Sequence, residues 1–504
     1  MSNEEQALSE ARLGEAPNEA NIEHILGPML ENDRPLFYCF MQVDMAHTVM
    51  LAEQGILSDG QAGAILKVLR EIEAMGIDQF PVDPRHDTFL LQVERYMIDK
   101  IGEDTAGRMH TGRSRNDQGA AVDRIYSRDR LLEVFGHLLE LQDTMLDLAE
   151  KHAETLMPGY THLQHAQPTT FGHVLMRHYY TFERSQQRIQ GAFARTNLNA
   201  LGGAAMAGTS WPLNRRRTAE LLGHEGLVNN SSDTGAFDTD FPTENASALA
   251  LAITDISRFA TDLYVWSTWE FQMIEIADGL AGTSSIMPQK KNPHALERIR
   301  SLAGLAIGWV PAMLGTMRSA SSSDLGLAFA GEQMPVMSRA TISASELLRV
   351  TLQTMQVNEE IMRERAGVFW STTSNLADEL VRHTNISFRT AHHVVGRVVR
   401  NAIRDGVPPT GVTGAMVDRA AEESIGREVN LSDELVRNAL DPDAFIWSRT
   451  TEGSVNPDKV RETVIDGRSR QADHRTWYQE KRLLLENARG KLDAAAVQLI
   501  ESTD

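Results

Sequence analysis

The chain has 504 residues, of which 42% are hydrophobic, 23% are charged and only 6% are aromatic. This length and this apolar content exclude a disordered protein and predict two or three folded domains. The formal net charge of -20, from 69 acidic and 49 basic side chains, disfavours a broad electrostatic surface for nucleic acid or for an anionic membrane, so we expect neither as a partner.

The N-terminal part of the chain, residues 1–112, is predicted to be a helical domain. Its first ten residues are polar and acidic and lack the basic-then-apolar order of a targeting segment. Cys39 is the only cysteine of the chain, which excludes an internal disulfide and a thiolate metal site. No stretch approaches the roughly 20 uninterrupted apolar residues of a membrane span. We therefore expect a cytoplasmic protein.

A polar turn with the sequence HTGRSRNDQ, residues 110–118, precedes the first long helix. It holds the guanidinium groups of Arg113 and Arg115 and the amide of Asn116. Arginine offers a planar fork that matches a carboxylate, and the following helix adds free N–H groups and a positive dipole end. The turn could bind a carboxylate, but a polar helix cap with ion pairs explains the same residues.

Three long helices are predicted in the middle of the chain, within 119–158, 242–279 and 335–367, and they define a central long-helix bundle domain, 113–366. The first stretch has leucines at helical spacing, and the second has no internal glycine or proline. A helix of up to about 36 residues would be about 54 Å long, so these helices should pack along one another and across subunits. Strand patterns are sparse. The predicted fold class is all-α, with a C-terminal helical domain at 367–504.

The proline-bounded loop PGYTHLQHAQP, residues 158–168, places two histidines among short polar side chains. Histidine titrates near pH 7, so His162 or His165 could move protons in a reaction. A loop histidine is also often only a hydrogen-bonded structural group, and the loop taken by itself leaves both interpretations open.

The sharpest signal is the loop GTSSIMPQKKNP, residues 282–293, which combines two serines, two lysines and an amide between helices. A lysine and backbone N–H groups can stabilise an oxyanion that develops during a reaction. The chain contains no GxxxxGK[ST] phosphate loop, no GxSxG nucleophile elbow and no HExxH zinc site. The pair His392 and His393 lies in a predicted helix and is interpreted as structural, because adjacent helical positions do not share a face.

The loop at 282–293 resembles the GSSxMPxKxNP signature of the fumarase/aspartase superfamily, with Thr283 at the position of its glycine. Together with HTGRSRNDQ and GYTHLQHAQP it resembles argininosuccinate lyases, and the similarity spans most of the chain. The resemblance implies an almost entirely helical subunit, a homotetramer, and active sites built from loops of three subunits. It also implies a β-elimination without metal or organic cofactor, in which the C–N bond of an N-substituted succinyl group breaks to give fumarate and an amine.

The resemblance also implies a role for each matching residue. Ser284 would be the general base, and Lys290 and Asn292 would stabilise the doubly charged aci-carboxylate that forms when the proton leaves. His162, paired with Glu297, would orient groups and help to protonate the departing nitrogen. The residues implied in binding the dicarboxylate and amine substrate are Arg115, Asn116, Thr161, Ser285, Gln289 and Asn292.

The chain departs from the family in the half that selects the amine. Argininosuccinate lyases have a tyrosine followed by glutamine and lysine after the signature loop, whereas 298–335 has neither tyrosine nor lysine, and small residues dominate 319–331. Met29 stands where the family presents a serine. We therefore expect the released amine to differ from arginine, because a pocket without these polar partners loses the hydrogen bonds that select a guanidino acid. Candidates are other N-substituted aspartates, including aminopolycarboxylates such as ethylenediamine-disuccinate, with argininosuccinate as the alternative.

Two alternatives come from other functional classes. A non-catalytic structural paralogue would keep the fold, as lens crystallins that resemble these lyases do, but the retained Ser284, His162, Lys290 and Asn292 argue against it. A serine hydrolase that uses Ser284 and His162 would instead form an acyl-enzyme.

Overall fold

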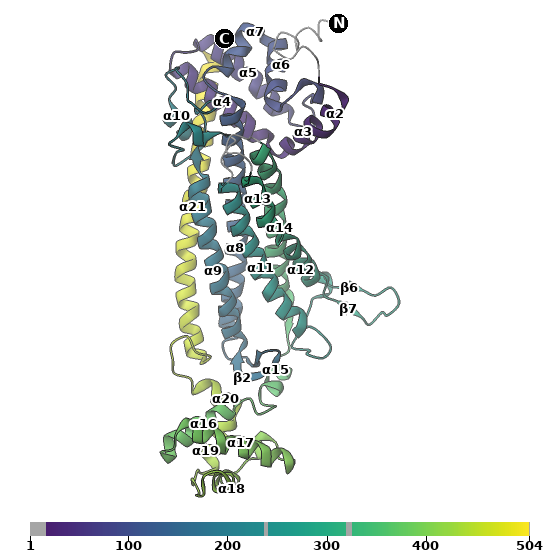
Figure 1. The fold of residues 1–504 in the computed structure, drawn as a ribbon, viewed down its shortest axis with the longest axis vertical. Helices are drawn as coiled ribbons and strands as arrows, with labels where there is room; N and C mark the ends of the chain where they lie inside the picture. Colours follow the sequence, from purple (N-terminus) through teal and green to yellow (C-terminus); the bar gives the residue numbers. More distant parts are fainter. Residues whose placement is uncertain (1–16, 236–239, 319–324, 503–504) are drawn as a thin grey trace.

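The computed structural model describes residues 17–235, 240–318 and 325–502. The segment 319–324 and the side chains of 325–331, which belong to the stretch expected to select the amine, lie outside this description. Figure 1 shows an elongated molecule with a helical region at each end and a bundle of long helices between them. The prediction of a helical, multi-domain fold is confirmed.

The N-terminal region packs five helices around α4, whose side chains are almost all buried from Phe37 to Leu51. Phe80 and Phe89 join Phe37 in an aromatic cluster, with the rings of Phe37 and Phe89 edge to face at 5.8 Å between centroids. Burial of this cluster holds the region together. Its helices are α2 (Glu19–Asn21), α3 (Gly27–Asp33), α4 (Phe37–Glu53), α5 (Asp59–Met75), α6 (Phe89–Ile101) and α7 (Glu103–Ala106).

Five long helices run side by side in the bundle (Figure 1). They are α8 (Arg115–Lys151), α9 (Phe171–Thr196), α11 (Asp240–Trp266), α14 (Leu325–Thr354) and α21 (Pro457–Glu501). The first begins where Ser114 and Asp117 form a capping box, in which each side chain accepts a backbone N–H of the other end of the turn. With 37 residues, α8 is about 55 Å long.

Two of the three predicted helices end at other residues than expected. Helix α11 stops at Trp266 instead of continuing toward residue 279, because the chain turns there and Gln272 takes a left-handed φ of 49°. Helix α14 begins at Leu325, passes through Pro335 and ends at Thr354. A short strand, β8 (Gln356–Val357), then pairs with β5 (Ile274–Glu275) before α15 (Glu359–Ala366), so the third predicted helix is two helices.

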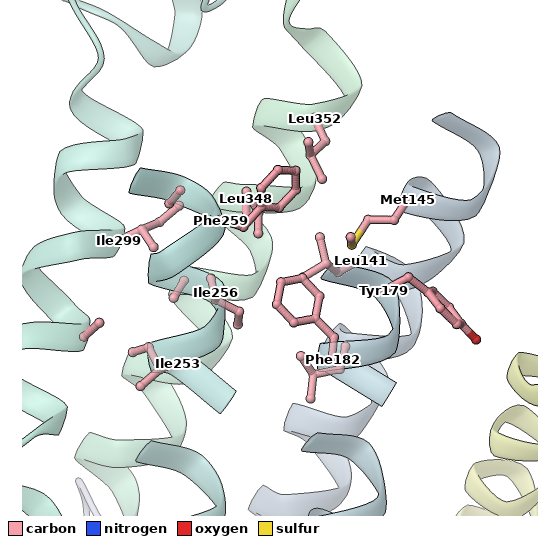
Figure 2. Packing of buried hydrophobic residues seen from close by; sticks show 14 of the residues in the cluster. Leu141, Met145, Tyr179, Phe182, Ile253, Ile256, Phe259, Ile299, Leu348 and Leu352 are labelled. Carbon is pink, nitrogen blue, oxygen red and sulfur yellow. The ribbon is translucent and has the colours of Figure 1, made fainter. Parts of the chain in front are cut away.

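The bundle core is built from large apolar side chains that meet between the long helices. Figure 2 shows Leu141 from α8, Phe182 from α9, Phe259 from α11 and Leu348 from α14 pointing toward one another. The hydroxyl of the buried Tyr179 donates a 2.7 Å hydrogen bond to the carbonyl of Gly467 in α21, which satisfies a polar group that would otherwise be costly to bury. Helix α21 is thereby fixed along α9.

Short two-stranded sheets carry the connections at the bundle ends, where the sequence predicted loops. In the described ranges they are β1 (Leu156–Thr161) with β2 (Gln164–Thr170), β3 (Leu198–Asn199) with β4 (Gly226–Leu227), β5 with β8, and β6 (Gly282–Thr283) with β7 (Lys291–Asn292). The pairs β1–β2 and β6–β7 are antiparallel hairpins. The second hairpin projects sideways from the bundle (Figure 1).

The C-terminal region is a small helical cluster with its own apolar core around Leu380, Val394 and Val436. It is followed by α21, which returns along the whole bundle to the N-terminal region (Figure 1). The predicted domain boundaries at residues 112 and 366 stay a prediction. The structure adds that α21 runs from the C-terminal region along the bundle to the N-terminal region. The cluster contains α16 (Thr373–Thr384), α17 (Phe388–Arg404), α18 (Gly414–Ile425), α19 (Asp433–Leu440) and α20 (Pro442–Trp447).

Among the residues that the structure describes, one helical stretch is long and apolar enough, by length and composition, to cross a membrane. It is His294–Met317, with a mean hydropathy of 1.2, and it combines α12 (His294–Ala306) with α13 (Trp309–Met317). Only 28% of its most apolar window is buried, and Leu305 and Ile307 are 67% and 73% exposed. An apolar surface of this kind on a bundle helix calls for a partner.

Candidate active site

The predicted site residues fall into three clusters, and a single chain does not bring them together. Arg115 and Asn116 begin α8, whereas Thr161 and His162 follow shortly after its other end, about 55 Å away along the helix. The signature loop forms the projecting β6–β7 hairpin (Figure 1). One small substrate therefore cannot touch all three clusters of the same chain.

Most polar residues of the HTGRSRNDQ turn hold the fold. Arg113 and Asp44 form a fully buried ion pair with a 2.6 Å N–O distance, and Gln118 donates to the same Asp44 oxygen at 2.6 Å. Asp117 accepts the backbone N–H groups of Gly202 and Ala204 at 2.7 and 3.0 Å. These residues form the polar cap with an ion pair that the sequence allowed, and carboxylate binding by this turn stays a prediction.

Arg115 and Asn116 are the residues of this turn that remain directed to a cavity. They line a cavity of about 390 Å³ between the start of α8 and the N-terminal region, and Met29 lies on its wall as the sequence register suggested. The positive end of the α8 dipole favours an anion at this mouth. The geometry suits the carboxylates of a succinyl group.

His162 occupies the tip of the β1–β2 hairpin. Thr161 and Gln164 are paired, and the two residues between them, His162 and Leu163, have φ values of 55° and 58°, so they form a type I′ turn. Such turns normally use glycine or asparagine, and a left-handed conformation costs other residues roughly 1–2 kcal/mol each. The fold retains this strained turn, which exposes the His162 imidazole and the Thr161 hydroxyl at the hairpin tip.

The second histidine of the loop, His165, has a structural environment. Its ring packs edge to face on Tyr160 at 5.3 Å and on Phe369 at 6.2 Å. Burial lowers its pKa, and the charge of Arg365 lowers it further. Between the two histidines that the sequence left open, His162 is the one placed to meet a ligand.

Ser284 lies just after β6, where the hairpin loop folds back toward its hydroxyl. The Ser284 Oγ accepts the backbone N–H groups of Met287 at 3.1 Å and of Ile286 at 3.4 Å. Two N–H donors aimed at one oxygen stabilise it when it becomes negative. This arrangement favours the alkoxide that a serine base requires.

The two adjacent lysines of the loop have different roles. Lys291 in β7 forms ion pairs with Glu275 at 2.9 Å and with Asp278 at 2.7 Å, and these carboxylates raise its pKa. Lys290 is exposed and has no ion pair with any residue that the structure describes. Lys291 therefore fixes the hairpin base, and Lys290 remains available to a ligand.

The other residues of the signature follow from the hairpin geometry. Thr283 lies in β6 with an ordinary strand backbone, so the glycine of the family pattern is not needed there. Gly282 is needed, because a Cβ atom would lie 1.8 Å from the ring of His294. Gln289, Lys290 and Asn292 line a cavity of about 560 Å³ beneath the hairpin.

Ser285 and Glu297 are also near the hairpin, on exposed positions. Ser285 lies on the loop next to Ser284, and Glu297 lies in the first turn of α12. Within the described chain Glu297 forms no ion pair with His162. The expected pair therefore stays a prediction that requires a second subunit.

Two carboxylates in the cavity at Arg115 and Asn116 were missed by the sequence. Asp33 at the end of α3 and Asp123 in α8 both line it. Burial raises the pKa of Asp33 to about 7, helped by the charge of Glu332, and raises that of Asp123 to about 8, helped by Asp33. No local pattern brings these three acids together, because they lie on α3, α8 and α14.

These carboxyl groups predict a stability that falls with pH. Their folded-state pKa values, about 7 and about 8, exceed the unfolded value of about 3.9, so the folded chain binds more protons between these limits. The melting temperature of the ligand-free protein should drop from pH 5 to pH 8, and Asp123→Asn should make that drop smaller. Thermal unfolding at each pH tests this, with the exposed Asp104→Asn as control. Parallel pH curves for wild type and Asp123→Asn would contradict it.

One group among the described residues has metal-ligand spacing, and it is not at these clusters. His137 and Glu140 of α8 and Glu346 of α14 have ligand atoms within 4.8 Å of one another. Arg349 already pairs with Glu346 at 2.8 Å, so a positive charge stands where a metal ion would. The signature hairpin itself offers hydroxyl, ammonium and amide groups, which suit an organic anion better than a metal.

Comparisons with known proteins agree with this arrangement. A family model described as "Lyase" matches residues 29–308, and one described as "Argininosuccinate lyase C-terminal" matches residues 370–447. The chain is 39% identical over 466 residues to the argininosuccinate lyase of Methanosarcina acetivorans, covering 91% of each chain. It is 37% identical over 456 residues to argininosuccinate lyase 1 of Shouchella clausii, covering 89% of this chain and 91% of that protein.

Among solved structures, a substituted variant of EDDS lyase with bound fumarate has the same architecture. Its TM-score is 0.85 at 33% sequence identity, and the match covers 97% of both chains. The likeness therefore extends over the N-terminal region, the bundle and the C-terminal cluster together.

Proposed function

This chain belongs to the argininosuccinate lyase-like members of the fumarase/aspartase superfamily and is a fumarate-releasing carbon–nitrogen lyase, and from that premise we propose that its substrate is an N-substituted aspartate. The observation that carries the proposal is the β6–β7 hairpin, which places on one loop a serine supported by two N–H groups and a lysine without an ion pair to any described residue. The reaction is a reversible β-elimination of the amine.

The proposed steps use the residues as they stand. The Ser284 oxygen takes a proton from the succinyl carbon next to a carboxylate, and the electron pair moves into that carboxylate as an aci-carboxylate. Lys290 stabilises this second charge with its ammonium group and Asn292 with a hydrogen bond. The electron pair then returns to form the carbon–carbon double bond, the C–N bond breaks, and the departing nitrogen takes a proton from His162 as it leaves as the amine. Arg115, Asn116 and Thr161 hold the carboxylates throughout, with Ser285 and Gln289 as further contacts.

A homotetramer with shared sites is the assembly that we propose. The length of α8 separates the Arg115 cluster from the His162 cluster, so a complete site needs contributions from different copies. The exposed apolar surface of α12 and α13 supplies an interface for such copies. Across that interface His162 would meet Glu297. We propose the cytoplasm as the compartment, which a chain with a single cysteine fits.

Mixed tetramers test the shared site. Arg115→Met and His162→Asn should each be nearly inactive alone. Co-expressed in equal amounts, they should recover about a quarter of wild-type fumarate release, because each contribution comes from an unaltered copy with a probability of about one half. The matched control pairs Arg115→Met with Asn116→Ala, which damage the same cluster and should show no recovery. Inactive Arg115→Met/His162→Asn mixtures would contradict a site shared in this way.

The identity of the amine is tested in the direction of synthesis. Incubation with fumarate and a panel of amines, followed by mass analysis of the adduct, should give an N-substituted aspartate. Ethylenediamine-disuccinate and argininosuccinate are tested as substrates in the direction of elimination. Fumarate release without labelling by a serine-reactive phosphonate separates this proposal from a serine hydrolase. No turnover of any member of the panel would favour the structural paralogue.

A further inference from the structure

We propose that the amine released by this enzyme carries a second, distal positive charge, and that Asp33 and Asp123, with Glu332 beside Asp33, bind it at the inner end of the cavity that Arg115 and Asn116 line. This inference rests on the proposed function and specifies its substrate class. The amine that fits is an alkyl diamine or a related amine with a terminal ammonium group and no terminal carboxylate.

The cavity has one end for an anion and one end for a cation. Arg115 and Asn116 stand at the start of α8, and Asp123 lies two helical turns further along the same face, about 10 Å from Asn116 along the axis. Asp33 faces the same space from the end of α3. A succinyl group at the first end therefore directs its amine substituent along α8 toward the carboxylates.

One side of the wall between the two ends is apolar. It is formed by side chains of the first helices and of α6, namely Ile25, Leu26, Met29, Phe40 and Phe89, while Asp87, Thr88 and Gln118 also line the cavity. A methylene chain suits the apolar side, where a planar guanidinium would find no polar partner. Met29, which replaces the serine of the family, belongs to this wall.

The carboxylates of Asp33 and Asp123 form no ion pair with a described residue, and the nearby charge of Arg124 only partly offsets the rise in the pKa of Asp123. Neither Asp33 nor Asp123 accepts a hydrogen bond from any residue that the structure describes. Arg34, next to Asp33, pairs with Asp78 at 2.6 Å. Arg124, next to Asp123, donates to the carbonyl of Arg195 at 3.0 Å and stacks on the ring of Phe241. The neighbouring arginines are thus directed elsewhere.

Glu332 adds a third carboxyl group close to this end. It lies in α14, receives a hydrogen bond from Asn32, and its charge raises the pKa of Asp33. Segment 319–331, which precedes it, contains one charged residue, Asp324, and no lysine or arginine. Three acids in a partly desolvated space attract an ammonium group and repel a carboxylate. Arginine and ethylenediamine-monosuccinate both end in carboxylates, so they fit this end less well than a simple diamine.

The test measures amine preference in the synthetic direction at saturating fumarate, where the amine nitrogen adds to one carbon of fumarate and a proton adds to the other. The probes are 1,4-diaminobutane, 1-aminobutane, which has the same chain without the second charge, and arginine. Wild-type kcat/KM should favour the diamine over 1-aminobutane and over arginine by at least about tenfold each, the scale of one lost charged contact.

Substitutions of the three acidic residues then test whether they cause the preference for the diamine. Asp33→Asn, Asp123→Asn and Glu332→Gln should each move the ratio of diamine to 1-aminobutane toward one, and a ratio is unaffected by a loss of folded protein. Glu31→Gln, an exposed carboxylate on the same helix as Asp33, should keep the wild-type ratio.

The outcomes separate this inference from the function on which it rests. Adducts with every amine at similar kcat/KM, faster addition of arginine, or unchanged ratios in all three variants would overturn the inference and leave the lyase proposal standing. Failure of every amine to add to fumarate would overturn both.

Discussion

Ser284→Ala is expected to lower kcat for fumarate release by about three orders of magnitude or more, with little change in substrate binding. The serine oxygen is the proposed base, and removal of a positioned base typically costs 10² to 10⁴ in rate. An alcohol is a poor base at neutral pH, so its anion must be stabilised by the two N–H groups at 3.1 and 3.4 Å and by an ammonium. Every 1.36 kcal/mol of that stabilisation is worth a factor of ten.

The measurement follows fumarate absorbance for kcat and calorimetry for binding to the inactive variant. Ser285→Ala is the matched control, since the next residue is a proposed contact and should change KM more than kcat. A Ser284→Ala enzyme with near wild-type kcat would remove this residue as the base. Equal effects of the two alanines on kcat would place the chemistry elsewhere in the loop.

Lys290→Met is expected to lower kcat by about two to three orders of magnitude, because it removes the charge that stabilises both the serine anion and the aci-carboxylate. The neighbouring Lys291→Met offers a direct comparison with the same change of side chain. It breaks surface ion pairs with Glu275 and Asp278, which contribute little on their own, so we expect less than about a tenfold loss.

Steady-state kinetics and thermal unfolding of both variants distinguish the two roles. Lys291→Met should lower the melting temperature slightly and keep turnover, whereas Lys290→Met should keep the melting temperature and lose turnover. The reverse pattern would mean that the second lysine, and not the first, faces the substrate.

Some of this structure could be predicted because its cause is local. The start of α8 follows from Ser114 and Asp117, whose spacing is that of a capping box. The end of α11 could not be predicted in the same way, because no glycine or proline marks the turn after Trp266. The absence of glycine and proline between residues 242 and 279 allowed a helix of about 36 residues, but it did not require one.

The hairpin at His162 shows a second limit of prediction from the sequence. Its turn uses His-Leu where a type I′ turn normally has asparagine or glycine, so the sequence looked like a loop. The signature residues around Ser284 could be proposed because a resemblance named them. Asp33, Asp123 and Glu332 had no such signal, since only the packing of three separate helices brings Asp33 and Asp123 to one cavity and Glu332 close to Asp33.

The length of α8 has a consequence for populations of unequal chains. Its two ends serve different catalytic centres in the proposed tetramer, so each polypeptide is spread over several of them. A copy altered at one end would spoil only the centre that this end serves, whereas a copy altered at both ends would spoil two, so a cell that makes such a doubly defective version would lose activity out of proportion to gene dosage. Defects at opposite ends, by contrast, would rescue one another.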